Sequence, residues 1–301
     1  MKKIFNSIII LATLSTLFLT GCKSVPKYND GALRVLASTT FLADITQNIA
    51  GDHIQVSSLL PFGADPHAYQ AAPADVARIA ESDFLILNGL EYEHFIESLL
   101  ENAGGERVII EASAGLSPKK DAGRAHGVDP HMWLDPNLVI TYVANIRDGL
   151  IEADPNGAEI YKANADAYMA ELKDLDAWIV EQVSSIPVKR RLLLTNHEAM
   201  GYFAERYGFQ IVDTIIPSLS SEAGTSAQGL AAVIDKIKAS GAPAIFLGEA
   251  ENADLANQIA EETGVKVVSD LYLESLTHVA PAATYIDMMK HNVTRIVDAL
   301  R

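Results

Sequence analysis

One long segment with helical spacing in the middle of the chain restricts the folds available to it. Asp154-Pro155 has the pattern of a helix N-cap followed by a first-turn proline. Apolar residues then recur, mostly at steps of three and four: Ile160, Ala163, Ala167, Leu172, Leu175, Trp178, Ile179 and Val183. This spacing predicts a helix of about 28–30 residues, roughly 45 Å long, that ends near Ser184. A helix of that length favours a rigid connection between two lobes, and a coiled coil is the alternative.

Segments with strand-like and helix-like patterns alternate on both sides of this helix. In the first half, the strand candidates are 34–38, 54–60, 84–88 and 107–110, with a helix at 73–81. In the second half, they are 191–195, 210–216, 244–247 and 265–269, with helices at 198–207, 228–240, 254–263 and from 283 onward. The predicted fold class is therefore α/β, with mostly parallel sheets. We expect two (β/α) lobes, residues 33–153 and 186–301, joined by the long rigid helix at 154–185.

The first residues have the pattern of a secretory signal peptide. Lys2 and Lys3 precede an apolar run, and Leu19-Thr20-Gly21 stands directly before Cys22, the only cysteine. An uncleaved membrane helix is the alternative, because the run approaches the ~20 residues that a span requires. The tetrapeptide resembles the bacterial lipobox, whose cysteine is lipid-modified and becomes the new N-terminus. We therefore expect residues 1–21 to be removed, Cys22 to anchor the protein to the membrane of the bacterial cell envelope on its extracytoplasmic side, and residues 22–32 to form a tether.

The charge of the chain argues against nucleic acid as a partner. The sequence holds 23 basic and 39 acidic residues, and losing Lys2 and Lys3 leaves 21 against 39, a formal charge of −18. Such a surface repels phosphate backbones and favours the approach of a cation. Many acidic proteins bind no metal, so the charge alone identifies no ligand.

Three of the eight histidines stand where binding sites form in α/β proteins, at the ends of strands or in proline-bounded loops. His67 follows Asp65-Pro66 after the second predicted strand, and His131 follows Asp129-Pro130. In both loops, proline stiffens the backbone immediately before the imidazole. His197 comes directly after the strand at 191–195. These three imidazoles are candidate metal ligands.

Four motifs occur in one order along the chain. They are Asp65-Pro66-His67, Asp129-Pro130-His131-Met132-Trp133-Leu134-Asp135-Pro136, Thr195-Asn196-His197-Glu198-Ala199 with Tyr202-Phe203, and Leu271-Tyr272-Leu273-Glu274-Ser275-Leu276. With the lipobox and the long helix, they resemble the zinc- and manganese-binding lipoproteins of ABC metal importers, the cluster A-I (cluster 9) solute-binding proteins. The resemblance covers essentially the whole chain and is closest to zinc-binding members that lack a long histidine-rich loop. It implies a membrane permease and its cytoplasmic ATPase as partners, and we expect a monomer.

The resemblance also implies one metal ion in the cleft between the lobes, bound by two side chains from each lobe. The first two ligands of the family match His67 and His131. The third matches His197, a position that is a carboxylate in typical manganese-binding members. The fourth is usually an aspartate in a Leu-Tyr-x-Asp-Ser-Leu pattern, and the matching residue here is Glu274. Asp270, at the end of the last predicted strand, is the alternative.

The residue types at this site favour zinc. Three neutral imidazoles and one carboxylate suit tetrahedral Zn²⁺. Mn²⁺ prefers more oxygen ligands, and zinc outranks it in affinity at most sites of nitrogen and oxygen donors. We therefore expect Zn²⁺, with Mn²⁺ or Fe²⁺ as alternatives. The stretch 117–128 replaces the long histidine-rich loop of many zinc-binding members and holds only His126, which we interpret as a solvated loop residue.

Other classes of function fit the sequence less well. A zinc hydrolase keeps an open coordination position for water, and the chain has no His-Glu-x-x-His motif. The lone cysteine and the absence of a Gly-x-Ser-x-Gly elbow argue against a nucleophilic enzyme, so we expect no enzymatic activity. A siderophore or haem receptor leaves the histidine loops without a reason to converge. An adhesive surface lipoprotein remains an alternative that is compatible with metal capture.

Two smaller features have their own interpretations. Glu91-Tyr92-Glu93-His94 is interpreted as the polar start of a helix beside the cleft. Asp135 has two open roles: it either supports a metal ligand from behind or caps the helix that follows Pro136.

Overall fold

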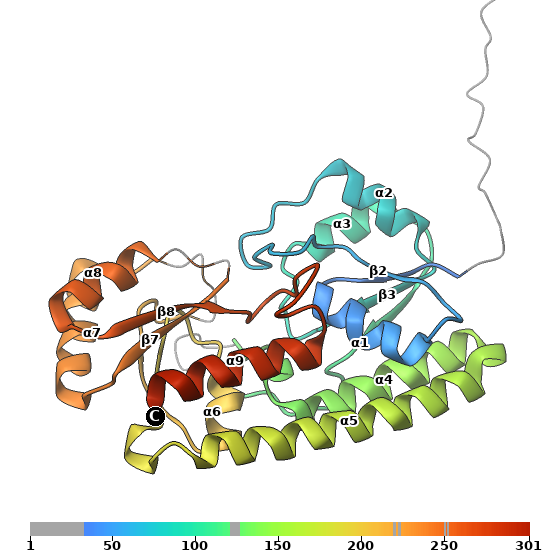
Figure 1. Ribbon diagram of the computed structural model, residues 1–301. Coiled ribbons are helices and arrows are strands. Elements are labelled where there is room, and N and C mark those ends of the chain that lie inside the picture. Colours follow the sequence, from blue (N-terminus) through green and yellow to red (C-terminus); the bar gives the residue numbers. More distant parts are fainter. Residues whose placement is uncertain (1–32, 121–126, 219–220, 222–223, 250, 252) are drawn as a thin grey trace, which may run out of the picture. The chain divides into compact units, whose positions relative to one another are not determined.

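The structure is a computed structural model that describes residues 33–120, 127–218, 221, 224–249, 251 and 253–301 (Figure 1). Leu33–Arg301 form one compact unit. The predicted signal peptide, Cys22 with its tether, and His126 lie outside the described residues. Within the described part of the chain, no helix is both long enough and apolar enough to cross a membrane.

The first sheet is fully parallel, and its two central strands are buried on both faces. Its strands are β1 (Val35–Ala37), β2 (Val56–Ser58), β3 (Phe84–Leu87) and β4 (Val108–Glu111), in the order β2-β1-β3-β4. Side chains alternate between the faces along each strand. Val35 and Phe84 face the core that includes α1 (Thr40–Ala50), whereas Leu36 and Leu85 face α2 (Pro73–Glu81) and α3 (Ile96–Ala103). The four predicted strands and the helix at 73–81 are confirmed, while α1 and α3 were not expected.

The second sheet repeats this arrangement. Its strands are β5 (Leu192–Thr195), β6 (Gln210–Thr214), β7 (Ala244–Gly248) and β8 (Lys266–Leu271), all parallel, in the order β6-β5-β7-β8. Its helices are α6 (Gly201–Tyr207), α7 (Ala227–Ser240), α8 (Asp254–Thr263) and α9 (Tyr285–Leu300). Leu194 and Ile245 pack in a core with α7 and α8, whereas Leu193 and Phe246 join the core that contains α9. Two lobes with parallel sheets, as predicted, are therefore confirmed.

The long helix α5 (Ala158–Ser184, 27 residues) links the two lobes. It contacts α1 in the first lobe and α6 and α9 in the second. It is not isolated, because α4 (Pro136–Ala153), the helix expected after Pro136, lies alongside it (Figure 1). One apolar core runs from the first sheet along α4 and α5 to the second sheet. This continuous core is what makes the connection rigid.

The start of α5 differs from the prediction. A short 3₁₀ turn, Pro155–Gly157, precedes it, so the helix begins at Ala158. The carboxylate of Asp154 caps no helix, because it accepts a hydrogen bond from the Tyr161 hydroxyl (2.6 Å) and pairs with His53 Nε2 (2.8 Å). Glycine is needed at position 157, since a Cβ there would lie 2.4 Å from the Tyr161 ring.

The buried face of α5 also differs from the prediction in its first half. Tyr161, Ala165 and Tyr168 are buried, and the expected core residues Ile160, Ala163 and Ala167 are exposed. Each tyrosine ring removes more apolar area from water than an isoleucine or alanine side chain, so the tyrosines determine which face turns inward. From Leu172 to Val183 the predicted stripe is confirmed, although Trp178 within it is only half-buried against the core.

Candidate metal centre

Four buried side chains that the sequence singled out lie together in the structure. His67 and His131 come from the first lobe, and His197 and Glu274 from the second, with ligand-type atoms all within 4.8 Å of one another. Glu274 Oε1 lies 3.7 Å from His67 Nε2, 3.5 Å from His131 Nε2 and 3.4 Å from His197 Nε2. Each of these four atoms is buried and lacks a hydrogen-bond partner among the described residues. Buried polar atoms normally have partners, so four orphaned atoms facing one another indicate a site for an ion.

The spacing of these atoms suits a small ion with four ligands. Around a regular tetrahedral Zn²⁺ with bonds of 2.0–2.2 Å, ligand atoms are about 3.3–3.6 Å apart. The three distances from Glu274 Oε1 fall at 3.4–3.7 Å. A set this compact leaves room for a single ion and none for an organic ligand.

The repeated Asp-Pro-His tripeptide has one structural role in both of its loops. Asp65 Oδ1 accepts a hydrogen bond from the backbone N–H of His67 (2.9 Å), and Asp129 Oδ1 accepts one from that of His131 (3.0 Å). An aspartate that bonds the backbone two residues ahead forms an Asx turn, which fixes the direction of the histidine. Asp129 also bonds His131 Nδ1 (2.8 Å), so that Nε2 points into the site.

Two glutamates after β7 hold the side chains that the second lobe contributes. Glu251 bonds His197 Nδ1 and leaves Nε2 facing the site. Glu249 accepts hydrogen bonds from the backbone N–H groups of Leu273 (2.8 Å), Glu274 (3.2 Å) and Ser275 (2.6 Å), which fixes the loop after β8. Burial raises the pKa of Glu249 to about 7, although the bonds from Leu273 and Glu274 act to lower it. Neither glutamate was predicted from the sequence, because no spacing rule connects them to His197 or to the loop after β8.

The segment that begins at Glu91 was predicted to start a helix, and this prediction is wrong. Leu90 and Glu91 have φ of 58° and 60°, and α3 begins only at Ile96. The turn brings Tyr92 into the site, where its hydroxyl donates a hydrogen bond to Glu274 Oε2 (2.5 Å). Glu93 accepts hydrogen bonds from the Ser38 hydroxyl (2.7 Å) and from the backbone N–H of Asn88 (2.6 Å). The tyrosine flanked by two glutamates was recognised in the sequence, but it was interpreted as a helix start and not as part of the site.

Asp135 and Asp270 do not reach the cluster. Asp135 is the N-cap of α4 and accepts a hydrogen bond from the backbone N–H of Asn137 (2.9 Å), so of its two open roles the structure supports capping. Asp270 is 45% exposed and pairs with Arg295 (2.8 Å). The structure therefore brings Glu274, and not Asp270, to the three histidines.

The cluster is a coupled set of charges. Burial acts to raise the pKa of Glu274, but the three nearby imidazoles, which stabilise its ionised form, outweigh burial and hold that pKa well below its usual range. Burial acts to lower the pKa of His131 and His197. Asp129 and Glu274 nevertheless raise the pKa of His131, and Glu251 and Glu274 raise that of His197 to about 10. Without a metal ion, the carboxylate is therefore ionised and His197 is protonated at neutral pH.

Metal binding should consequently release protons. A histidine binds metal only as neutral imidazole, and the raised pKa values keep His131 and His197 protonated above pH 6.5. We expect at least about one proton released per ion at pH 7, and an apparent affinity that falls at least about tenfold per unit as the pH is lowered. Calorimetric titrations in buffers of different ionisation enthalpy measure the released protons. Zero release would contradict the charge state described above.

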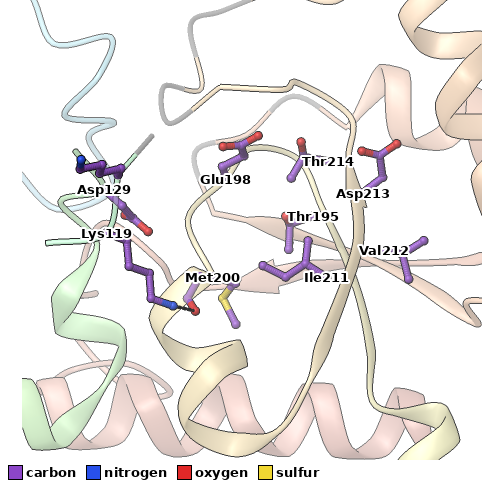
Figure 2. Close-up of a pocket in the computed structure, with 11 residues that line it drawn as sticks. Lys119, Asp129, Thr195, Glu198, Met200, Ile211, Val212, Asp213 and Thr214 are labelled. Carbon is purple, nitrogen blue, oxygen red and sulfur yellow. Dashed lines mark hydrogen bonds between the residues drawn. The ribbon is translucent and has the colours of Figure 1, made fainter. Parts of the chain in front are cut away.

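A pocket of about 320 Å³ is lined in part by Asp129 but does not contain the cluster (Figure 2). Its walls come from the start of α6, the strand β6 and the segment around Lys119. Two of its charged residues are paired within the protein: Lys119 pairs with Glu205 and donates a hydrogen bond to the Gly201 carbonyl (2.7 Å), and Asp213 pairs with Lys236 (2.9 Å). The orphaned atoms, and not this pocket, mark the binding site.

The chain matches one protein family and several known proteins along most of its length. Residues 35–299 match the family ZnuA, described as the periplasmic component A of a zinc-uptake complex. The chain is 36% identical over 305 residues to the manganese-binding lipoprotein MntA of Halalkalibacterium halodurans (100% of this chain, 99% of the relative). It is 32% identical over 295 residues to the iron-binding protein YfeA of Yersinia pestis (97% and 92%). The solved periplasmic zinc-binding protein TroA of Treponema pallidum matches with a TM-score of 0.83 and 26% identity (90% and 99%).

Two parallel-sheet lobes on a long helix, with a compact histidine-carboxylate cluster, define a metal-binding solute-binding protein. The chain belongs to the ZnuA family, as its resemblance to the ABC-importer lipoproteins had implied. It is therefore an extracytoplasmic metal-binding component of an ABC transporter and not an enzyme. The zinc hydrolase and adhesin alternatives gain no support from these relatives. The relatives carry names for different metals, so the family alone does not decide which ion is bound.

Proposed function

We propose that the protein binds one Zn²⁺ through His67, His131, His197 and Glu274 and delivers it to a membrane permease driven by a cytoplasmic ATPase. The observation that carries this proposal is the set of four buried atoms, three imidazole nitrogens and one carboxylate oxygen, that face one another without partners. The role is capture and release without chemistry on the cargo. Capture from dilute solution requires tight binding, and four fixed protein ligands provide it.

The donor set supports zinc over the other ions named among the relatives. Three nitrogens and one oxygen are the composition of many tetrahedral zinc sites. Mn²⁺ favours sites dominated by oxygen ligands, and Fe²⁺ ranks below zinc in intrinsic affinity for the same donors. Mn²⁺ is the main alternative, because the MntA relative is named for manganese.

We also propose that a lipid anchor holds the protein at the membrane. Residues 1–21 act as the signal peptide, and a lipid on Cys22 anchors the mature monomer to the membrane, with 22–32 as the tether. The lobes are residues 33–153 and 186–301, joined by 154–185. An anchor of this kind keeps the binding protein near its permease and raises their effective concentration.

Elemental analysis of the soluble protein that begins after Cys22 tests the metal assignment. The protein would be purified without an affinity histidine tag, stripped with a chelator, and titrated with Zn²⁺ and Mn²⁺ in competition. We expect one Zn²⁺ per chain and a zinc affinity at least about 100-fold above that for manganese, in keeping with the intrinsic order of the two ions. Tighter binding of Mn²⁺ or Fe²⁺ would overturn the choice of metal. Failure to bind any of these ions in a stoichiometric amount would overturn the function.

A further inference from the structure

We propose that Tyr92 is a specificity-determining residue that keeps the site four-coordinate. The Tyr92 hydroxyl donates a hydrogen bond to Glu274 Oε2, so that Oε1 is the oxygen that binds the metal ion. The carboxylate then binds through one oxygen, which favours Zn²⁺ over ions that prefer more oxygen ligands. The inference rests on the proposed function, because it assumes that Glu274 and the three histidines bind the cargo.

The two oxygens of Glu274 have different surroundings. Oε1 faces the three histidine nitrogens and has no hydrogen-bond partner, whereas Oε2 accepts the hydrogen bond from the Tyr92 hydroxyl at 2.5 Å. Glu274 is 5% exposed and Tyr92 is 1% exposed, so water does not compete freely for this bond. A carboxylate can bind a metal through both oxygens only if both are available. In bidentate binding, Oε2 would share its electron density between the metal ion and a short hydrogen bond inside the protein, which weakens its bond to the metal.

The backbone before Tyr92 adopts a conformation that holds the ring at this place. Gly89, Leu90 and Glu91 have φ of 84°, 58° and 60°, three consecutive residues in the left-handed region. Non-glycine residues rarely adopt such angles, and they persist where the surrounding structure enforces them. Here the buried carboxylate of Glu93 accepts the backbone N–H groups of Asn88 and Gly89. Strain maintained in this way next to a binding site indicates a functional position.

Aromatic packing fixes the direction of the Tyr92 hydroxyl. The ring of Tyr92 lies 4.8 Å from that of Trp133 and meets the His67 ring edge-on at 5.5 Å between centroids. Tyr92 belongs to the first lobe and Glu274 to the second, so the bond also joins the lobes across the site. A ring enclosed in this way cannot turn its hydroxyl toward another acceptor without repacking its neighbours.

The number of available oxygens bears directly on which ion fits. With Oε2 occupied, the protein offers three nitrogens and one oxygen, the number that tetrahedral zinc requires. With Oε2 free, the same side chains could offer three nitrogens and two oxygens, which is closer to the preference of Mn²⁺ for oxygen-rich, higher coordination. The hydroxyl of Tyr92 is thus the feature that separates these two coordination states.

Competition titrations of wild-type protein and Tyr92→Phe with Zn²⁺ and Mn²⁺ test this inference. We expect the ratio of zinc to manganese affinity to fall at least about tenfold in the variant, the scale of changes beyond the direct ligands. Bound Co²⁺ provides a second readout, because four-coordinate Co²⁺ absorbs visible light much more strongly than five- or six-coordinate Co²⁺. We expect intense bands in the wild-type protein and weaker bands in Tyr92→Phe.

Tyr161→Phe is the matched control, since it also removes a hydroxyl bonded to a carboxylate, at Asp154 and away from the cluster. It should leave the metal ratio and the Co²⁺ spectrum unchanged. An unchanged ratio in Tyr92→Phe, or equal losses for both ions, would overturn the inference while zinc binding by the wild-type protein upholds the proposed function. Weak Co²⁺ bands in the wild-type protein would overturn it without any variant. Wild-type protein that binds no metal would overturn the proposed function and the inference together.

Discussion

Replacing Glu274 by glutamine should lower the affinity for Zn²⁺ at least about 100-fold, beyond the 10–100-fold that changes outside the direct ligands cost. Glu274 supplies the one negative charge among three imidazoles, and its pKa lies well below the usual range because those imidazoles stabilise the ionised form. Glutamine keeps the shape of the side chain and can still accept the hydrogen bond from Tyr92, but its neutral amide is a poor ligand for zinc. Competition with a chelator of known affinity measures the loss.

Asp270→Asn is the control for this variant, because Asp270 was the alternative fourth ligand. Its carboxylate is 45% exposed and pairs with Arg295, so we expect a zinc affinity within about threefold of the wild-type value, as for most surface changes. An equal loss in both variants would mean that the loop after β8 changes shape on binding. Tight zinc binding by Glu274→Gln would remove Glu274 from the ligand set.

Local features of the sequence were sufficient to single out the three histidines, whereas Glu274 and the convergence of all four ligands were expected only from the resemblance to the metal-binding lipoproteins. His67 and His131 follow Asp-Pro, and His197 follows a buried strand. Their partners could not be predicted in the same way. Glu251 reaches His197 across 54 positions, and Tyr92 reaches Glu274 across 182. The first contact depends on packing within the second lobe and the other on packing between the lobes, and no local pattern records either.

The fold was predictable to a similar depth. Parallel strands that are buried on both faces form short apolar runs, which are recognised without knowledge of the tertiary structure. The buried face of α5 was misassigned because Tyr161 and Tyr168 were not counted as apolar, although both side chains are buried. Helix α4 begins at Asp135-Pro136, the same type of cap signal as Asp154-Pro155, and there the signal was correct. At position 154 the same signal did not produce a helix cap, because the Asp154 carboxylate pairs with His53 and accepts a hydrogen bond from Tyr161.

Trp133 shows how the core and the site depend on each other. It lies in a 3₁₀ turn (Met132–Leu134) directly after His131, is fully buried, and stacks on Phe41 with ring centroids 4.7 Å apart. Its indole Nε1–H donates a hydrogen bond to the Leu273 carbonyl (2.8 Å), one residue before Glu274. A single side chain of the first lobe thus supports the loop of the second lobe that carries the carboxylate.

Trp133→Ala should therefore reduce both stability and metal affinity. Emptying so large a buried volume costs about 3–5 kcal/mol in the free energy of unfolding, which lowers Tm by roughly 10 °C for a protein of this size. The loop before Glu274 also loses its bond to the indole, so we expect zinc affinity to fall about 10–100-fold, as for other outer supports of a metal site. Thermal unfolding of the metal-free protein and zinc competition below Tm measure the two effects separately.

Phe84→Ala distinguishes the two roles of Trp133. Phe84 is buried at the start of β3, at the opposite end of the strand from the site, and its loss should lower stability by a similar 3–5 kcal/mol. Because Phe84 touches neither the cluster nor the loop after β8, zinc affinity should remain within about threefold of the wild-type value. If Trp133→Ala also kept wild-type affinity, the indole would serve the core alone. A loss of affinity confined to Trp133→Ala would instead mean that the core of the first lobe fixes the carboxylate contributed by the second.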